Sequence, residues 1–253
     1  MTIFNGKHKL LISHWENSTV NYKNTNVDSI YSIGAATFSE TLSNGFLSNL
    51  EVNVSSGYSG VVLNLREDVK LDTLHDYVEL EFTLDSFDTA SLDTWAFRYG
   101  LFDNKGVPAQ SDNDPSLNNP EGYIAWHSTS DDIAQGQTGL SGVFRQVDGP
   151  SNILGVDNVG GGTSANPGNL PSDIARQGVA VFRQLYNSNA PTELKFRITY
   201  NTTSASLAFR GGNTTEQITT RNATRPQELT FNSIAFAFNN NFSLSNLRVH
   251  SNK

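Results

Sequence analysis

The feature that most constrains the fold of this 253-residue chain is a repeated alternation of apolar and polar residues. Residues 77–84 read Tyr-Val-Glu-Leu-Glu-Phe-Thr-Leu, and residues 95–101 read Trp-Ala-Phe-Arg-Tyr-Gly-Leu. Successive side chains of a strand point to opposite faces of its sheet, so this period of two predicts half-buried β-strands. In the first run the alternation assigns Glu79 and Glu81 to a solvated strand face.

Further runs of similar length recur along the chain, separated by Asn, Gly, Pro or Thr. Gly 20 and Phe 15, with charged residues at only 17%, fit strands and turns better than helices. Many short strands with turn residues between them predict an all-β fold, a two-sheet antiparallel jelly-roll sandwich forming one domain over residues 1–253. Besides the two runs above, strands are predicted at residues 58–65, 179–186, 194–200, 206–210, 233–238 and 244–249.

Composition also excludes several classes of function. Cys 0 rules out disulfides, zinc-thiolate sites and a cysteine nucleophile. A formal net charge of -8 disfavours a nucleic-acid partner, which would require a basic face. Membrane insertion is not expected, because no apolar run approaches the roughly 20 residues that span a bilayer. The first residues lack the hydrophobic region of a secretory signal.

Three segments resemble a known family. They are Phe97-Arg-Tyr-Gly-Leu-Phe-Asp103, the pair Gly122-Tyr123, and the ending at residues 231–249. Together they resemble the concanavalin A-like, laminin G-like jelly rolls of bacterial surface and polysaccharide-associated proteins. The resemblance implies two antiparallel sheets, one of them concave, with sugars bound across that face or at loops along one edge. It also implies an extracellular or cell-surface location and, in some members, a structural calcium ion.

Basic and polar side chains at outward positions form the candidate ligand site. Alternation assigns Arg98, Tyr123 and His127 to one open surface, and Arg145 and Arg197 also fall at outward positions. Arginine forms bidentate hydrogen bonds with carboxylates and sulfates, so such a surface would attract an acidic polysaccharide. The leading prediction is therefore a glycan-binding, lectin-like module. The alternative, that these residues are divided between the two outer faces, stays open at this stage.

Two other functions remain open. A polysaccharide lyase acting on a uronate-containing glycan would use Tyr123 and His127 as acid and base, with Arg98 and Arg145 neutralising the carboxylate. A retaining glycoside hydrolase is disfavoured, because no strand carries its Glu-x-Asp-x-x-Glu pattern. The third possibility is a structural module of an extracellular matrix, appendage or virion.

The long polar loop after residue 103 offers hard oxygen ligands. Asp112 and Asp114 are the candidates for a structural calcium ion, although their spacing does not match a helix-flanked calcium loop. No cofactor is required by any of the three functions. Trp95 and Trp126 alternate with apolar neighbours, so both are predicted to lie in the core.

Overall fold

The computed structural model describes residues 27–43, 46–75, 77–87, 96–114, 121–128, 142–147, 191–200, 204–211, 214–221 and 228–251. The predicted strand at 179–186 and Trp95 lie outside these ranges, and the domain limits 1–253 stay a prediction. None of the described segments forms an apolar helix of membrane-spanning length. The described residues contain eleven strands: β1 (Val27–Ser43), β2 (Phe46–Leu71), β3 (Tyr77–Phe87), β4 (Ala96–Asp103), β5 (Glu121–Ser128), β6 (Gly142–Val147), β7 (Thr192–Thr199), β8 (Ser204–Gly211), β9 (Thr214–Arg221), β10 (Leu229–Phe238) and β11 (Phe242–Ser251).

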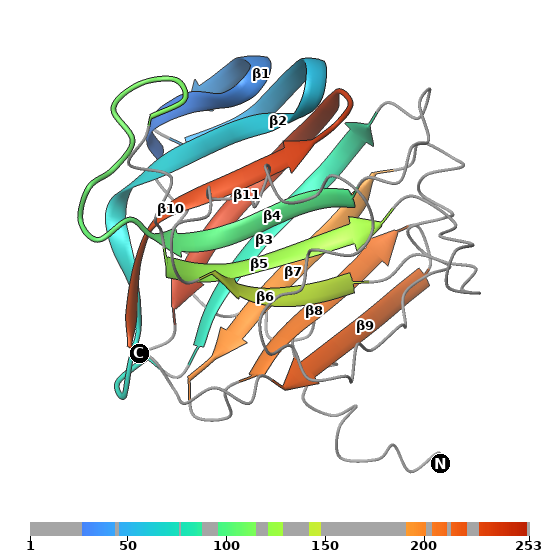
Figure 1. Cartoon of the computed structure of the whole chain (residues 1–253). Coiled ribbons are helices and arrows are strands. Elements are labelled where there is room, and N and C mark those ends of the chain that lie inside the picture. The colour runs from blue at the N-terminus through green and yellow to red at the C-terminus, as the bar shows by residue number, and fades with distance from the viewer. Residues whose placement is uncertain are drawn as a thin grey trace.

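The strands form one hydrogen-bonded antiparallel sheet, in the order β6-β5-β4-β10-β2-β11-β3-β7-β8-β9, with β1 paired to β2 (Figure 1). Strand β2 is the connection between two halves of this sheet. Its C-terminal part pairs with β10 and its N-terminal part pairs with β11. The all-β antiparallel prediction is confirmed. Instead of two separate sheets, the described strands form a single sheet that curls so that its halves face each other.

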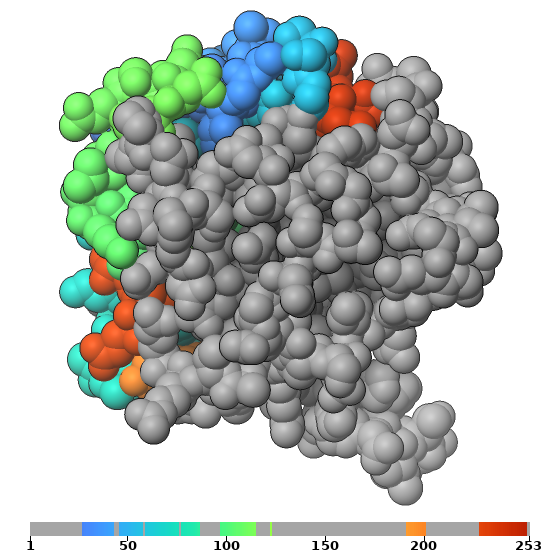
Figure 2. All heavy atoms as spheres, in the orientation of Figure 1, coloured from blue at the N-terminus to red at the C-terminus, as the bar shows by residue number. Residues whose placement is uncertain are grey.

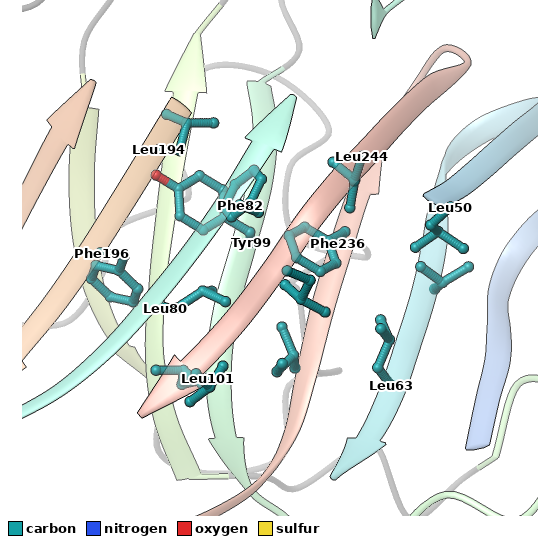
Figure 3. Packing of buried hydrophobic residues seen from close by; sticks show 14 of the residues in the cluster. Leu50, Leu63, Leu80, Phe82, Tyr99, Leu101, Leu194, Phe196, Phe236 and Leu244 are labelled. Atoms are coloured by element: carbon teal, nitrogen blue, oxygen red, sulfur yellow. The ribbon is translucent and has the colours of Figure 1, made fainter. Parts of the chain in front are cut away.

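Aromatic side chains from the two halves meet in the core. The ring of Phe82 on β3 lies 4.8 Å from that of Tyr99 on β4 and 5.0 Å from that of Phe236 on β10, both in edge-to-face geometry. Strands β10, β2 and β11 separate β4 from β3 in the sheet order, so these contacts cross the space between the halves (Figure 3). Burying each ring contributes about 1.5–3 kcal/mol, and edge-to-face pairs add to that.

Strand β2 is longer than predicted at both ends. Residues 66–72 are rich in charged side chains, as turns often are, yet the strand continues to Leu71. Residues 35–43 and 46–53, whose apolar spacing is irregular, also belong to strands. The irregular spacing has a physical cause: register shifts between β1 and β2, at Ile33/Ala35 and at Thr41/Leu42, change which face the following residues occupy.

Candidate functional site

Arg98 lies on β4, between Phe97 and Tyr99, whose side chains are in the core. The alternation correctly assigns Arg98 to the opposite face. The prediction that this face is open at Arg98 is wrong, since the residue is only 4% exposed. The neighbouring Tyr99 is fully buried, so its ring cannot stack on a sugar. Alternation identifies the face of a strand, but it carries no information about what covers that face.

The backbone register separates Arg98 from the other two members of the predicted surface. Arg98 is opposite Trp126 in the β4–β5 ladder, whereas Tyr123 is opposite Leu101 and His127 is opposite Phe97. Directly opposite residues of an antiparallel pair share a face of the sheet. The positions of Tyr123 and His127 therefore belong to the core-facing side of β4. The prediction that Arg98, Tyr123 and His127 share one surface is contradicted by this register.

The same register brings Arg145 and Trp126 to the face of Arg98. In the β5–β6 ladder Trp126 is opposite Val143, and Arg145 is opposite Ile124. Ile124 is in turn opposite Gly100, two residues along β4 from Arg98. The positions of Arg98, Trp126 and Arg145 thus lie on one face of three adjacent strands. Trp126 was predicted to lie in the core, and its register position is on the other side of the sheet.

Arg197, the last predicted ligand-binding residue, lies on β7 in the other half of the sheet. There it belongs to a group of ionisable side chains on the face of β3, β7 and β11 that points away from the core. We call this group the charge cluster, and define it as Glu79, Glu81, Lys195, Arg197 and His250. The basic residues predicted from the sequence are therefore divided between the two halves, which is the alternative that the sequence left open.

Hydrogen bonds and ion pairs connect the charge cluster across β3 and β7. Arg197 Nε donates to Glu79 Oε2 at 2.7 Å, and Lys195 Nζ lies 3.8 Å from Glu79 Oε1. Lys195 Nζ also donates to Glu81 Oε1. These contacts follow from the register, which places Glu79 opposite Arg197 and Glu81 opposite Lys195. Glu79 is 2% exposed, so the prediction of a solvated face is wrong there, whereas the side chain of Glu81 is 13% exposed and keeps some contact with solvent.

The cluster extends to β11 and to one aromatic ring. His250 Nε2 lies 3.7 Å from Glu79 Oε1, and His250 is opposite Glu79 in the β3–β11 ladder. The guanidinium of Arg197 stacks on the ring of Tyr77 at 4.1 Å, and that ring meets His250 edge to face at 6.1 Å. Arg197 is consequently held from two directions, by a carboxylate at Nε and by a ring under its plane.

Burial changes the proton affinity of two members. It raises the pKa of the Glu79 carboxyl to about 7, although the charges of Arg197 and Lys195 oppose the change. It also lowers the pKa of the His250 imidazole to about 4. With both carboxylates ionised and His250 neutral, two negative charges balance two positive ones. Protonation of Glu79 leaves the cluster with one net positive charge.

The donor atoms of Glu79, Glu81 and His250 lie within 4.8 Å of one another and are the one such group of metal-ligand residues in the described part of the chain. A metal ion does not fit this group well. The ammonium of Lys195 already contacts both carboxylates, and Arg197 binds Glu79 from the other side. A divalent cation would have to displace the ammonium of Lys195 and would lie close to the positive charge of Arg197.

The predicted calcium ligands lie in a loop that follows β4 and covers the edge of β1 (Figure 2). Asp112 Oδ1 accepts from Ser32 N at 2.7 Å, and Asp114 Oδ2 accepts from Gln110 N at 2.7 Å. Asn113 adds two backbone-directed bonds, from its own N–H to Ser32 O and from Gly34 N to its Oδ1. Asp112 therefore helps to attach the loop to β1, and Asp114 closes a turn within the loop. Calcium binding by Asp112 and Asp114 stays a prediction.

The sequence predicts an outward position for Arg197, but not its partners in the charge cluster. A signal was present. Glu79 and Glu81 are two residues apart on one predicted strand, and Lys195 and Arg197 are two residues apart on another. Such complementary spacing favours pairing of the two strands, because opposite charges across a ladder are stabilising. His250 carried no comparable signal, since its neighbours in β11 include two register irregularities.

No protein-family model matches the sequence, and no curated protein sequence matches it. Similar solved structures include lectin II from Ulex europaeus, with 10% identity and a TM-score of 0.44 over 90% of this chain and 100% of that one. Arcelin-5, a lectin-like defense protein from Phaseolus vulgaris, has 10% identity and a TM-score of 0.48, covering 92% and 97%. A legume lectin-like domain from Entamoeba histolytica has 10% identity and a TM-score of 0.48, covering 87% and 91%. At these TM-scores, none of the similarities assigns a function to this chain.

Proposed function

We propose that this chain is a glycan-binding, lectin-like module for an acidic polysaccharide, acting outside the cell or at its surface. The ligand lies along the face of β4, β5 and β6 that includes the positions of Arg98, Trp126 and Arg145. The observation that supports this is the backbone register, which brings two cations and one aromatic residue to the same face of three adjacent strands.

The chemistry of these three residue types suits an acidic sugar. A guanidinium presents a planar fork of donors that matches a carboxylate or sulfate. An indole offers a flat apolar surface on which a sugar ring can stack. Because the whole chain has a net charge of -8, an anionic polymer is attracted only where basic residues gather. Arg98 is buried, so its charge contributes to the local potential while Arg145 and Trp126 are the residues to substitute first.

Affinity gel electrophoresis with a panel of polysaccharides tests the proposal. Polygalacturonate and alginate should retard the protein, and neutral dextran should not. Arg145→Ala and Trp126→Ala should each weaken binding to the acidic polymers about tenfold, the effect of losing one good charged or stacking contact of about 1.4 kcal/mol. Arg66→Ala is the matched control, because it removes an exposed arginine from β2. Equal loss in Arg145→Ala and Arg66→Ala would indicate only a general charge effect and would contradict the proposed site.

The lyase and assembly alternatives gain no comparable support. The lyase requires Arg98 and His127 in one groove, and the register places their positions on opposite faces of the sheet. The assembly module requires a large exposed apolar patch. Among the described residues, the large hydrophobic side chains with substantial exposure are Leu42, Leu74 and Val107, which come from three different segments.

A further inference from the structure

The charge cluster has a property that the proposed glycan site does not explain. The cluster contains two carboxylates and two permanent cations. Its most buried side chain is the carboxyl group of Glu79, and its most accessible side chain is the cation Arg197. Glu79 has a side chain that is 2% exposed, and the side chain of Arg197 is 16% exposed. The carboxyl group that neutralises Arg197 is therefore buried more deeply than the guanidinium, which keeps some contact with solvent.

The geometry also fixes Arg197 independently of its ion pair. The guanidinium stacks on Tyr77 at 4.1 Å, and β3 holds Tyr77 opposite Thr199 in the same ladder that places Arg197 opposite Glu79. Loss of the Glu79 charge would leave this stacking contact in place. A pre-oriented guanidinium is a strong binding group for oxyanions, because little side-chain freedom remains to be lost on binding.

We propose that the charge cluster is a proton-gated anion site, in which uptake of a proton by Glu79 releases Arg197 from its internal carboxylate and allows it to bind an external sulfate or carboxylate group. The proton comes from solvent and binds a carboxyl oxygen of Glu79. Lys195 remains paired with Glu81 in both states. The site is separate from the β4–β6 face and lies on the other half of the sheet.

The groups that face Glu79 support such a gate. On β3 they are Tyr77 and Glu81, on β7 Lys195 and Arg197, and on β11 His250 and Arg248. Burial keeps the pKa of Glu79 at about 7 and that of His250 at about 4. Between pH 8 and pH 6 the carboxyl of Glu79 therefore gains a proton while His250 stays neutral. Between pH 6 and pH 8 the gate therefore depends on the protonation of Glu79 and not on that of His250.

The test follows the Nε–H resonance of Arg197 by NMR during titration with sodium sulfate and, separately, sodium glucuronate, at constant ionic strength. With a pKa of about 7, about nine-tenths of Glu79 is protonated at pH 6 and about one-tenth at pH 8, so the apparent Kd of wild type should be about tenfold lower at pH 6. Glu79→Gln, which imitates the protonated carboxyl, should bind equally at both pH values. Glu51→Gln, which removes an exposed carboxyl from β2, should behave like wild type.

A wild-type response to both anions that is equal at pH 6 and pH 8 would overturn the gate, whether or not Glu79→Gln folds. A pH dependence that survives in folded Glu79→Gln would overturn the assignment to Glu79. Arg145→Ala separates this site from the proposed glycan site, because it should lose polysaccharide retardation and keep the sulfate response of Arg197. Tighter binding of glucuronate than sulfate would identify acidic sugars as the source of the anion, and the reverse would identify inorganic oxyanions.

Discussion

The two halves of the curled sheet bury the faces that point away from the core in different ways. In the half formed by β4, β10 and β2, the row Gly100, Ala235 and Val62 is buried and contains small or apolar residues. In the half formed by β7, β3 and β11, the corresponding row is Arg197, Glu79 and His250. The first row is fully buried, whereas in the second row Glu79 is buried and Arg197 and His250 are partly exposed. The first row depends on close approach of backbones and the second on charge balance. Because of this difference, the two halves should lose stability in response to different substitutions and conditions.

The largest effect should come from removing a cation from the charged half. Lys195→Ala leaves Glu79 and Glu81 in a buried position with one fewer counter-charge, and loss of a partner from a buried ion pair costs about 3–5 kcal/mol. Urea unfolding followed by circular dichroism measures the change. Lys70→Ala, at an exposed position of β2, is the matched control and should change stability by less than about 0.5 kcal/mol. Similar values for the two variants would mean that the cluster contributes nothing beyond a surface pair.

The small-residue half should instead be sensitive to added volume. A Cβ atom on Gly60 would lie 1.9 Å from Phe236 O and 2.6 Å from Ala237 Cα, both of them backbone atoms of β10. Gly60→Ala should therefore separate β2 from β10 and cost about 3 kcal/mol. Gly57→Ala is a useful comparison, since its Cβ meets no atom within 4 Å and only the φ of +63° opposes it. A smaller loss in Gly60→Ala than in Gly57→Ala would contradict the close approach.

The charged half should respond to pH through Glu79 and His250, which act in opposite directions. The folded pKa of Glu79 is above its ordinary value, so its contribution to stability is complete below about pH 4.5 and is lost as the pH rises through 7. The folded pKa of His250 is below its ordinary value, so its contribution is complete above about pH 6.5 and is lost as the pH falls through 4. Between pH 4.5 and 6.5 the two changes offset each other.

Substituting Glu79 or His250 alone should reveal the contribution of the other residue to the pH dependence of stability. Relative to wild type, Glu79→Gln should lose stability as the pH falls from 6.5 to 4.5, and His250→Gln should gain it, each by up to about 1.4 kcal/mol per pH unit. Thermal unfolding at several pH values, expressed as differences from wild type, gives the two slopes. Slopes of the same sign would show that the groups do not titrate as their burial indicates.

The smallest effect concerns the loop that covers the β1 edge beside the small-residue half. Asn113→Ala removes the side-chain acceptor of Gly34 N, which lies 2.6 Å from Asn113 Oδ1. It should cost about 1 kcal/mol, the net value of one such hydrogen bond. Amide hydrogen exchange at Gly34 is the direct measurement and should accelerate. Asn53→Ala, on the exposed side of β2, should leave that exchange rate unchanged.

The sequence predicted the strands well wherever one face belongs to the core. Val78, Leu80 and Phe82 alternate with polar residues and are buried as expected. Prediction failed where both faces are buried, because Arg98 and Glu79 have the residue types of exposed positions. Their burial depends on which strands lie beside them, and strands β3 and β7 are separated by more than a hundred residues of sequence. Periodicity within one strand contains no information about such long-range pairing.

The candidate site illustrates the same limit. Tyr123 and His127 were correctly placed on one face of their own strand, and Arg98 was correctly placed opposite the core side of β4. Whether Arg98 shares a face of the sheet with Tyr123 and His127 depends on the register between β4 and β5. A shift of one residue would move every side chain of β5 to the other face. The sequence between these strands, residues 104–120, contains no short hairpin-turn signal from which that register could be predicted.

The position of β2 between β10 and β11 has a consequence for how the chain reaches its native state. The strands that complete the middle of the sheet, β10 and β11, follow β2 by more than 150 residues, so Ser59 of β2 must wait for Phe238. Pairings of such high sequence separation slow folding, because the intervening chain loses much of its freedom when they form. On the ribosome, β2 can pair with β1 early, but its other edge would stay unpaired until β10 and β11 emerge. A chain that terminates before β10 would leave the centre of the sheet open to aggregation.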